Sequence, residues 1–181
     1  MGLLNQARTL GLIGAILEIF PYVDIIGYIL VLIAVKHISD YLQDKSIFND
    51  MIYAVITGIV GVIVGFGILV SSFFLAVPTF GLSSLAGIFV FLGIGWIILI
   101  ISAIFIRRSF NKIAARLNIN YFKTAGTLYL IGAITLIIFV GLIILLVAYI
   151  FQILAFNAVE EKAQPAEATT MPPPPPAMIL P

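Results

Sequence analysis

Long stretches without a charged side chain dominate the pattern of polar and apolar positions. Residues 51–106 contain no Asp, Glu, Lys, Arg or His, and their one strong helix-breaking cluster lies at 76–81. Each half is an apolar stretch of roughly 25 residues, and a helix needs roughly 20 to cross the hydrocarbon core of a bilayer. The pattern therefore predicts two antiparallel transmembrane helices, over 51–75 and 82–106.

The N-terminal apolar region allows two interpretations, because Pro21 interrupts it. In the first, one span is kinked at Pro21, and Glu18 and Asp24 lie near the bilayer midplane, where each carboxylate costs roughly 2.5–3.5 kcal/mol. In the second, two short helices over 3–20 and 22–38 turn at Pro21 and bring both carboxylates to the membrane interface. We favour this hairpin because it leaves no carboxylate in the hydrocarbon.

Residues 124–156 form a further long uncharged stretch and predict the last span. The following segment is acidic and then contains five consecutive prolines, Pro172–Pro176. It has too few apolar residues to build a core, so we expect a disordered, Pro-rich tail over 157–181. The whole pattern predicts an all-α membrane protein, with a bundle of five transmembrane helices in domain 1–156, or four if the first is kinked at Pro21.

Composition supports the membrane class and excludes several kinds of site. The chain is 62% hydrophobic and 9% charged, whereas soluble domains contain about 25% charged residues. The net charge of +1 gives no general attraction to nucleic acid. Cysteine is absent and His37 is the only histidine, so disulfides, thiolate catalysis and ordinary zinc or haem sites lack their ligands. We therefore expect no cofactor and no metal.

The charged residues gather in two loops, over 36–50 and 107–123. With five spans, these loops share one side with the N-terminus, and Lys162 is the only basic residue on the other side. The positive-inside rule then predicts a multi-pass protein of the cell membrane with cytoplasmic loops and the C-terminal tail outside.

The second loop also has a helical pattern of its own. Its apolar residues Phe110, Ile113, Ala114 and Leu117 share one helical face, opposite to basic residues. This pattern predicts a basic amphipathic helix at the membrane surface, or one leaving it. Four residues are candidates for contact with anionic lipid or a partner, with a simple topology determinant as the alternative: Arg107, Arg108, Lys112 and Arg116.

Two further groups of residues are candidates for function. Glu18 and Asp24 are the only acids in the N-terminal apolar region and could form an ion or proton site between the first two helices. We favour the alternative, in which they are interfacial carboxylates at a turn. Thr57, Gly61 and Gly65 recur every four residues, a spacing that lets a neighbouring helix pack closely.

No catalytic motif is visible: the chain has no HExxH, no phosphate-binding loop and no Ser-His-Asp set at a plausible depth. We therefore do not expect an enzyme. The sequence favours a non-enzymatic integral membrane protein that acts as an accessory or scaffolding component of a membrane assembly. The alternative is a small oligomeric transporter or channel. The expected partners are the lipid bilayer and a membrane protein or a second copy of this chain.

Several short segments resemble a known family. They are Leu10–Leu17, Pro21–Val23, Ile26–Lys36, Ile38–Asp40 and Asp44–Phe48. These segments are similar to small archaeal membrane proteins grouped as domain of unknown function 996 (DUF996). The resemblance implies an archaeal cell-membrane protein of several helices without an assigned activity, and it transfers no catalytic residue. Glu18 departs from the purely apolar run of that pattern.

Overall fold

The computed structural model describes residues 2–20, 22–74 and 82–159, and all regular secondary structure in this part of the chain is helical. The all-α class expected from the sequence is confirmed. The predicted turn at Pro78–Gly81 and the Pro-rich tail from 160 onward lie outside the described residues. The elements are α1 (Leu3–Leu17), α2 (Asp24–Tyr41), α3 (Lys45–Phe74), α4 (Leu82–Leu117), α5 (Asn120–Thr135), the 3₁₀ helix η1 (Leu136–Ile138) and α6 (Val140–Asn157).

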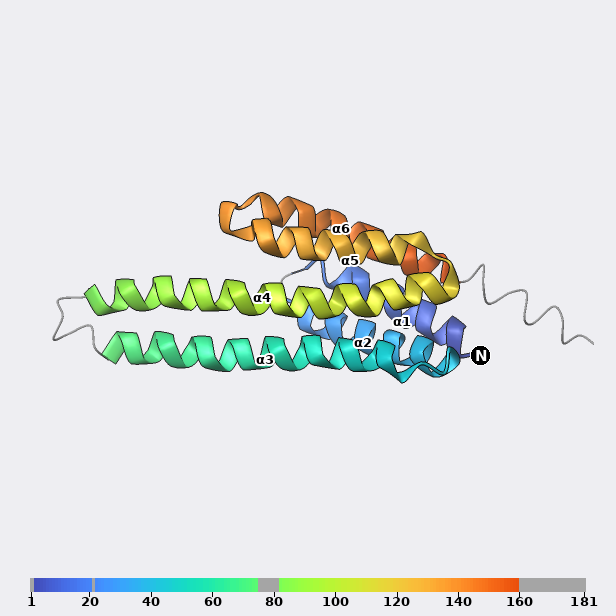
Figure 1. Cartoon of the computed structure of the whole chain (residues 1–181), viewed down its shortest axis with the longest axis horizontal. Helices are drawn as coiled ribbons and strands as arrows, with labels where there is room; N and C mark the ends of the chain where they lie inside the picture. Colours follow the sequence, from blue (N-terminus) through green and yellow to red (C-terminus); the bar gives the residue numbers. More distant parts are fainter. Residues whose placement is uncertain (1, 21, 75–81, 160–181) are drawn as a thin grey trace, which may run out of the picture.

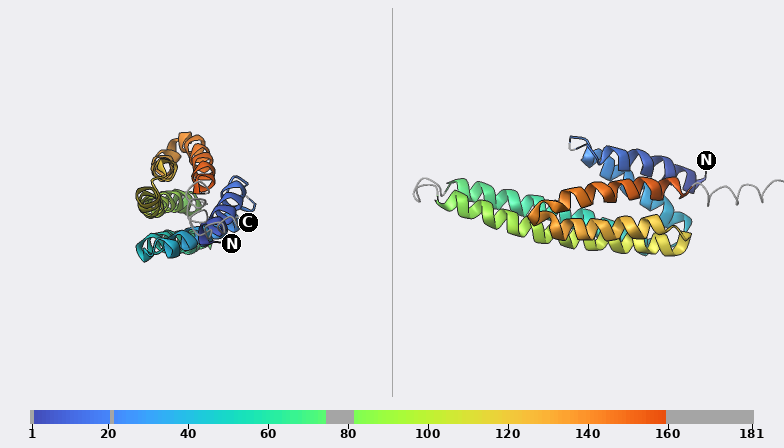
Figure 2. Two further views of the ribbon diagram at one scale, coloured as in Figure 1. Left: turned by 90° about the vertical axis from the view of Figure 1, so that its right-hand side faces the viewer. Right: turned by 90° about the horizontal axis from the view of Figure 1, so that it is seen from above.

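The helices form three antiparallel pairs, α1–α2, α3–α4 and α5–α6, which are visible as pairs end-on in Figure 2. Each helix packs against its neighbour in the sequence, and α6 returns to α1, so the contacts close a ring. The connections α2–α3 and α4–α5 and both described ends of the chain lie at one end of the molecule (Figure 1). We call this the polar end.

The pairs differ in length. Helices α3 and α4 have 30 and 36 residues, whereas α1, α2, α5 and α6 have 15 to 18. Helix α4 is therefore about 54 Å long and the short helices about 22–27 Å. As a result, α3–α4 extends well beyond the other two pairs (Figure 1). We call this projecting part of α3–α4, which contains Phe74 and Phe89, the arm.

A helical hairpin, and not one kinked span, describes the N-terminal region. Helices α1 and α2 cross where Gly14 meets Gly27: a Cβ on Gly14 would lie 2.6 Å from the Gly27 carbonyl oxygen and 2.9 Å from the Val31 nitrogen. Only glycine permits this approach, because backbone atoms cannot move aside as a flexible side chain can.

The expectation of one span over 124–156 is wrong, because this segment folds back on itself. Helix α5 ends at Thr135, and after η1 the residue Phe139 adopts a left-handed conformation with φ 62°. Gly141 then packs directly on the carbonyl oxygen of Gly132, which brings α6 against α5.

Because of this extra turn, the end of α6 returns to the polar end. The Arg8 guanidinium donates a hydrogen bond to the Asn157 side chain, with 3.2 Å between Nη2 and Oδ1. The sequence predicted that the chain after 156 would start on the side opposite to the polar loops. This prediction is wrong, because α6 ends at the polar end.

The two long helices extend further into the polar loops than the predicted spans 51–75 and 82–106. Residues 107–117 are the last turns of α4 and not a separate helix. Their predicted apolar face is buried, which confirms the amphipathic pattern: Phe110, Ile113, Ala114 and Leu117 are 0–7% exposed.

The best-packed part of the molecule lies in the half nearer the polar end. Phe110 of α4, Phe122 of α5 and Phe156 of α6 are fully buried and meet edge to face, with ring centroids 5.4 and 5.2 Å apart. Such pairs are each worth about 0.5–1.5 kcal/mol beyond the burial of their area. This aromatic core joins α5–α6 to α4.

The outside of the bundle is apolar. In the described part of the chain, four helical segments could cross a membrane by length and composition: Lys45–Phe74, Leu85–Leu117, Asn120–Ile138 and Val140–Asn157. At most 28% of the most apolar window of each is buried inside the protein. Their remaining apolar surface needs an apolar solvent, as in an integral membrane protein.

The crossing of α1 and α2 makes a prediction about stability. We expect Gly14→Ala to lower the free energy of unfolding by about 1–3 kcal/mol, because the added methyl group meets backbone. Gly58→Ala is the matched control, since a Cβ there meets nothing within 4 Å. This control should leave stability unchanged or raise it by up to about 1 kcal/mol, because alanine favours helix. Chemical unfolding in detergent, followed by circular dichroism, compares the two; equal stability would contradict the close crossing.

Candidate functional site

A buried polar cluster joins three helices inside the bundle. Glu18 directly follows α1, Tyr129 lies in α5 and Gln152 in α6, and these residues are only 7%, 8% and 1% exposed. A carboxyl, a phenol and an amide inside an apolar bundle each require a hydrogen-bond partner.

The three side chains supply these partners to one another. The Gln152 amide donates from Nε2 to Glu18 Oε2 at 2.8 Å. The Tyr129 hydroxyl lies 2.5 Å from Gln152 Oε1 and 3.2 Å from Glu18 Oε2. The cluster therefore connects the α1–α2 hairpin to both helices of the α5–α6 hairpin.

The geometry of the cluster is suited to a protonated carboxyl group. A phenol has a single proton to donate, and its closer acceptor is Gln152 Oε1. The phenol oxygen then faces Glu18 Oε2. A proton on Glu18 Oε2 would be donated to the phenol oxygen and would complete a ring of three hydrogen bonds. The cluster is thus able to hold one proton inside the bundle. Tyr149 extends it, since its ring meets that of Tyr129 edge to face at 5.5 Å.

Asp24 is not part of this cluster. It lies exposed in the first turn of α2, where a carboxylate suits the helix dipole. Glu18 instead has its hydrogen-bond partners on α5 and α6. The structure thus places the two acids that the sequence singled out in different surroundings, one buried and one exposed.

The basic residues at the end of α4 face acids at the start of α3. Lys112 Nζ lies 2.7 Å from Asp50 Oδ2, and Arg108 Nε lies 4.0 Å from Asp50 Oδ1. Nearer the polar end, Arg116 pairs with Asp44 at 3.3 Å. Hydrogen bonds from the Ser46 side chain and backbone, together with Arg116, lower the pKa of Asp44. Three of the four candidate contact residues thus make ion pairs within the chain.

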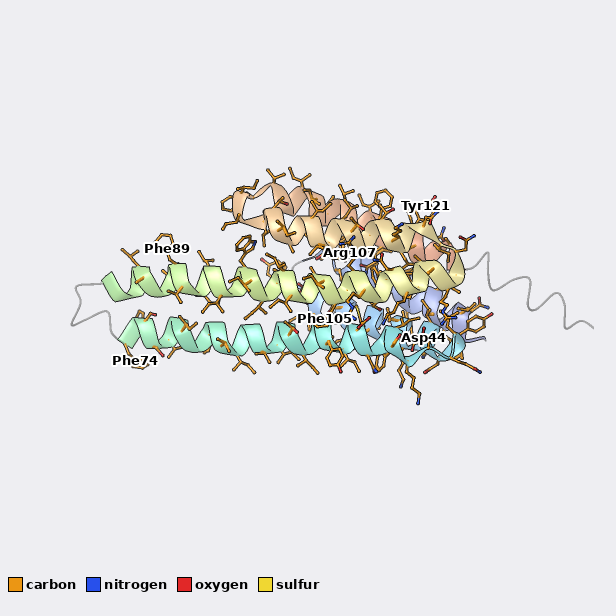
Figure 3. All side chains as sticks on the ribbon, in the orientation of Figure 1. Asp44, Phe74, Phe89, Phe105, Arg107 and Tyr121 are labelled. Carbon is orange, nitrogen blue, oxygen red and sulfur yellow. The ribbon has the colours of Figure 1, made fainter. Side chains whose placement is uncertain are left out.

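Arg107 is the fourth of these candidates and has a different environment. It is half-buried where α5 covers α4, and its Nε atom is buried without a hydrogen-bond partner (Figure 3). A Cβ added to Gly126 of α5 would lie 3.0 Å from the Arg107 Cα atom. Gly126 and Arg107 are therefore at the same level along the bundle.

The glycines of α3 and α4 fall into two groups. Gly61 faces Ile98 and Gly65 faces Phe91, both on α4, while the Thr57 hydroxyl bonds to the Tyr53 carbonyl of its own helix. The second group faces open space, with no atom within 4 Å of an added Cβ: Gly58 and Gly67 on α3, and Gly93 and Gly95 on α4.

Among the residues that the structure describes, no three His, Asp or Glu side chains come together as a metal ion would require. His37 is half-buried on α2, and its Nδ1 atom has no hydrogen-bond partner.

Tyr129 and Gln152 were not among the sequence candidates. Gln152 is the only amide between 124 and 156, and an amide in an apolar span is a signal that could have identified it. Its partners could not be found from one sequence, because the cluster depends on the unexpected turn at Phe139.

The ion pairs predict unequal roles for two basic residues. In Lys112→Ala, the Asp50 side chain, 8% exposed, loses its closest cation, and we expect the free energy of unfolding to fall by about 2 kcal/mol. Arg116→Ala removes an ion pair whose cation is 62% exposed, and it should change the free energy of unfolding by less than about 1 kcal/mol. Chemical unfolding in detergent measures both, and equal losses would contradict this assignment.

Comparison with known proteins places the chain in a family. A family model described as a protein of unknown function (DUF996) matches residues 23–150. The chain is 32% identical over 161 residues to an uncharacterized protein of Methanocaldococcus jannaschii. The aligned region covers 84% of this chain and 91% of that relative. No solved structure matches. The likeness read from the short apolar segments is confirmed, and the chain belongs to the DUF996 family of proteins of unknown function.

Proposed function

We propose that this integral membrane protein is a non-enzymatic accessory or scaffolding component of a membrane assembly. The arm is the observation that carries the proposal. In the arm, large apolar side chains point away from the other helix of the pair, among them Phe74 and Phe89, 78% and 73% exposed (Figure 3). The other two helical pairs do not reach them (Figure 1).

Small residues make the arm suitable for a partner helix. Gly67 of α3 and Gly93 of α4 face open space, since an added Cβ would meet no atom of the described residues within 4 Å. In lipid, helices associate by close packing at small residues, because the hydrophobic effect does not drive them together. A transmembrane helix of another protein is therefore the partner that fits the arm.

The distribution of charge supports one orientation. The Lys and Arg residues of the described part lie towards the polar end, on the first turns of α1 and α5, the last turns of α2 and α4, and the start of α3. The positive-inside rule favours a cytoplasmic polar end. In this orientation α6 also ends in the cytoplasm.

The accessory role predicts a partner that depends on the arm. Mild detergent extraction from native membranes, affinity capture of the tagged chain and mass spectrometry should recover one reproducible membrane protein. Gly67→Leu and Gly93→Leu should each reduce its yield several-fold, because leucine fills the space that the partner helix needs. Gly2→Leu is the control, since a Cβ there also meets nothing within 4 Å but lies outside the arm. Recovery of a monomer or a homo-oligomer alone would contradict the proposal.

A small transporter or channel is the second candidate function, because Glu18 is a buried carboxyl in contact with a phenol and an amide. Intramembrane carboxyls often belong to ion or proton paths. Transport would give reconstituted vesicles a proton or cation flux that Glu18→Gln abolishes and Asp24→Asn preserves. Glutamine keeps the shape and the donor of a protonated glutamate, so the fold should survive. The accessory role predicts no flux above that of empty vesicles. A flux that Glu18→Gln abolishes would contradict the accessory role and support transport.

A further inference from the structure

The depth of each hairpin in a bilayer follows from its position beside α4. Arg107 is the first charged residue of α4, and the 25 residues before it, 82–106, are uncharged. That apolar part is about 37 Å long, enough to cross a hydrocarbon core of about 30 Å. The level of Arg107 thus marks the boundary of the hydrocarbon at the polar end.

Two contacts give the reach of α5 beyond this boundary. Gly126 lies at the level of Arg107. Seven residues later along α5, the Ala133 carbonyl accepts a hydrogen bond from Trp96 Nε1 at 2.9 Å. Trp96 stands eleven residues before Arg107 on α4, about 16 Å into the apolar part. Helix α5 ends two residues later, at Thr135.

The turn at Phe139 therefore lies about 20 Å beyond the level of Arg107 by helix length. The α1–α2 turn is shallower, because Glu18 bonds to Tyr129, which is only about one helical turn beyond Gly126. Neither turn reaches the far end of α3–α4, and Figure 1 shows the three pairs ending at three successive distances from the polar end.

The polar residues at the α1–α2 turn, at the α5–α6 turn and at the far end of α3–α4 agree with these three depths. The shallow α1–α2 turn carries two acids, Glu18 and Asp24. Residues 136–147, at the α5–α6 turn, contain no polar side chain, and Phe139 and Ile143 are 77% and 70% exposed. Ser71 and Ser72 of α3 and Ser83 and Ser84 of α4 stand near the far end of the long pair. Polar residues thus occur at both ends of α3–α4 and are absent from the α5–α6 turn itself, over residues 136–147.

The backbone of the α5–α6 turn is also compatible with an apolar environment. Unpaired N–H and C=O groups are costly in lipid, which excludes open loops there. Here η1 leads through Phe139 directly into α6, and the Phe139 and Leu142 N–H groups bond to the Leu136 and Phe139 carbonyls at 2.9 and 3.2 Å. The turn leaves one residue outside a helix.

We infer that α3–α4 alone crosses the bilayer, and that α1–α2 and α5–α6 enter it from the polar end and turn back inside it. The exposed apolar surface of the α5–α6 turn contacts the acyl chains near the middle of the membrane. Six helices then lie side by side in the part of the membrane nearer the polar end, and only α3–α4 continue to the far surface. This inference is independent of the proposed accessory role, which requires only an accessible arm.

Spin-label depth measurements on single-cysteine variants test this inference, and the absence of native cysteine makes them direct. The full chain would be reconstituted in mixed phosphatidylcholine and phosphatidylglycerol vesicles. Lys45→Cys and Phe74→Cys mark the two ends of the long pair, and Ile26→Cys marks the α1–α2 turn. Ile138→Cys and Leu142→Cys mark the α5–α6 turn with two independent variants, both at positions at least 57% exposed. The measurement compares collisions of each nitroxide with oxygen, which enters lipid, and with a water-soluble nickel chelate.

We expect the labels at 138 and 142 to lie about 10–15 Å from the nearer hydrocarbon boundary, accessible to oxygen and protected from nickel. The labels at 45 and 74 should meet nickel, and the label at 26 should lie between these extremes. Nickel access at 138 and 142 equal to that at 74 would overturn the inference, because α5–α6 would then end at a membrane surface. Equal behaviour of the labels at 26 and 138 would overturn the stepped arrangement. Retained helicity and an unchanged elution volume verify the fold of each variant.

Discussion

The architecture depends on one constraint: charged groups must remain near water while the helices that carry them enter an apolar solvent. The chain meets it by placing its polar connections and both described termini at one end. Ion pairs such as Lys112–Asp50 and Arg116–Asp44 then hold α3 and α4 together at that end. The aromatic core around Phe110 and Phe122 lies in the same half, so cohesion is concentrated where the charges are.

The same constraint explains what the sequence could predict. The all-helical class follows from the uncharged stretches, and the hairpin follows from Pro21, because the residue before a proline is steered away from helical geometry. The buried face of 107–117 follows from the spacing of Phe110, Ile113 and Leu117. In each case the outcome depends on local side chains and on the solvent, and both can be read from one sequence.

The fold of 124–156 could not be predicted in the same way, because its turn lacks the usual polar, proline or Asn-Gly signals. Those signals belong to turns that meet water, whereas the turn at Phe139 is apolar. Length was the remaining signal: a single helix of this stretch would be about 50 Å long, well beyond a hydrocarbon core of about 30 Å. Tyr129 and Gln152 were missed for the same reason, since only the folded-back α5 and α6 bring them to Glu18.

Exposed apolar side chains do not by themselves require a partner, because lipid solvates them as well as protein does. The glycines of the arm provide a stronger argument. A glycine inside a helix costs about 0.5–1 kcal/mol relative to alanine, and a Cβ at Gly67 or Gly93 would meet nothing within 4 Å in the part of the chain that the structure describes. Alanine would thus stabilise the isolated chain at both positions. A partner helix that packs on the bare backbone at these glycines would offset this cost.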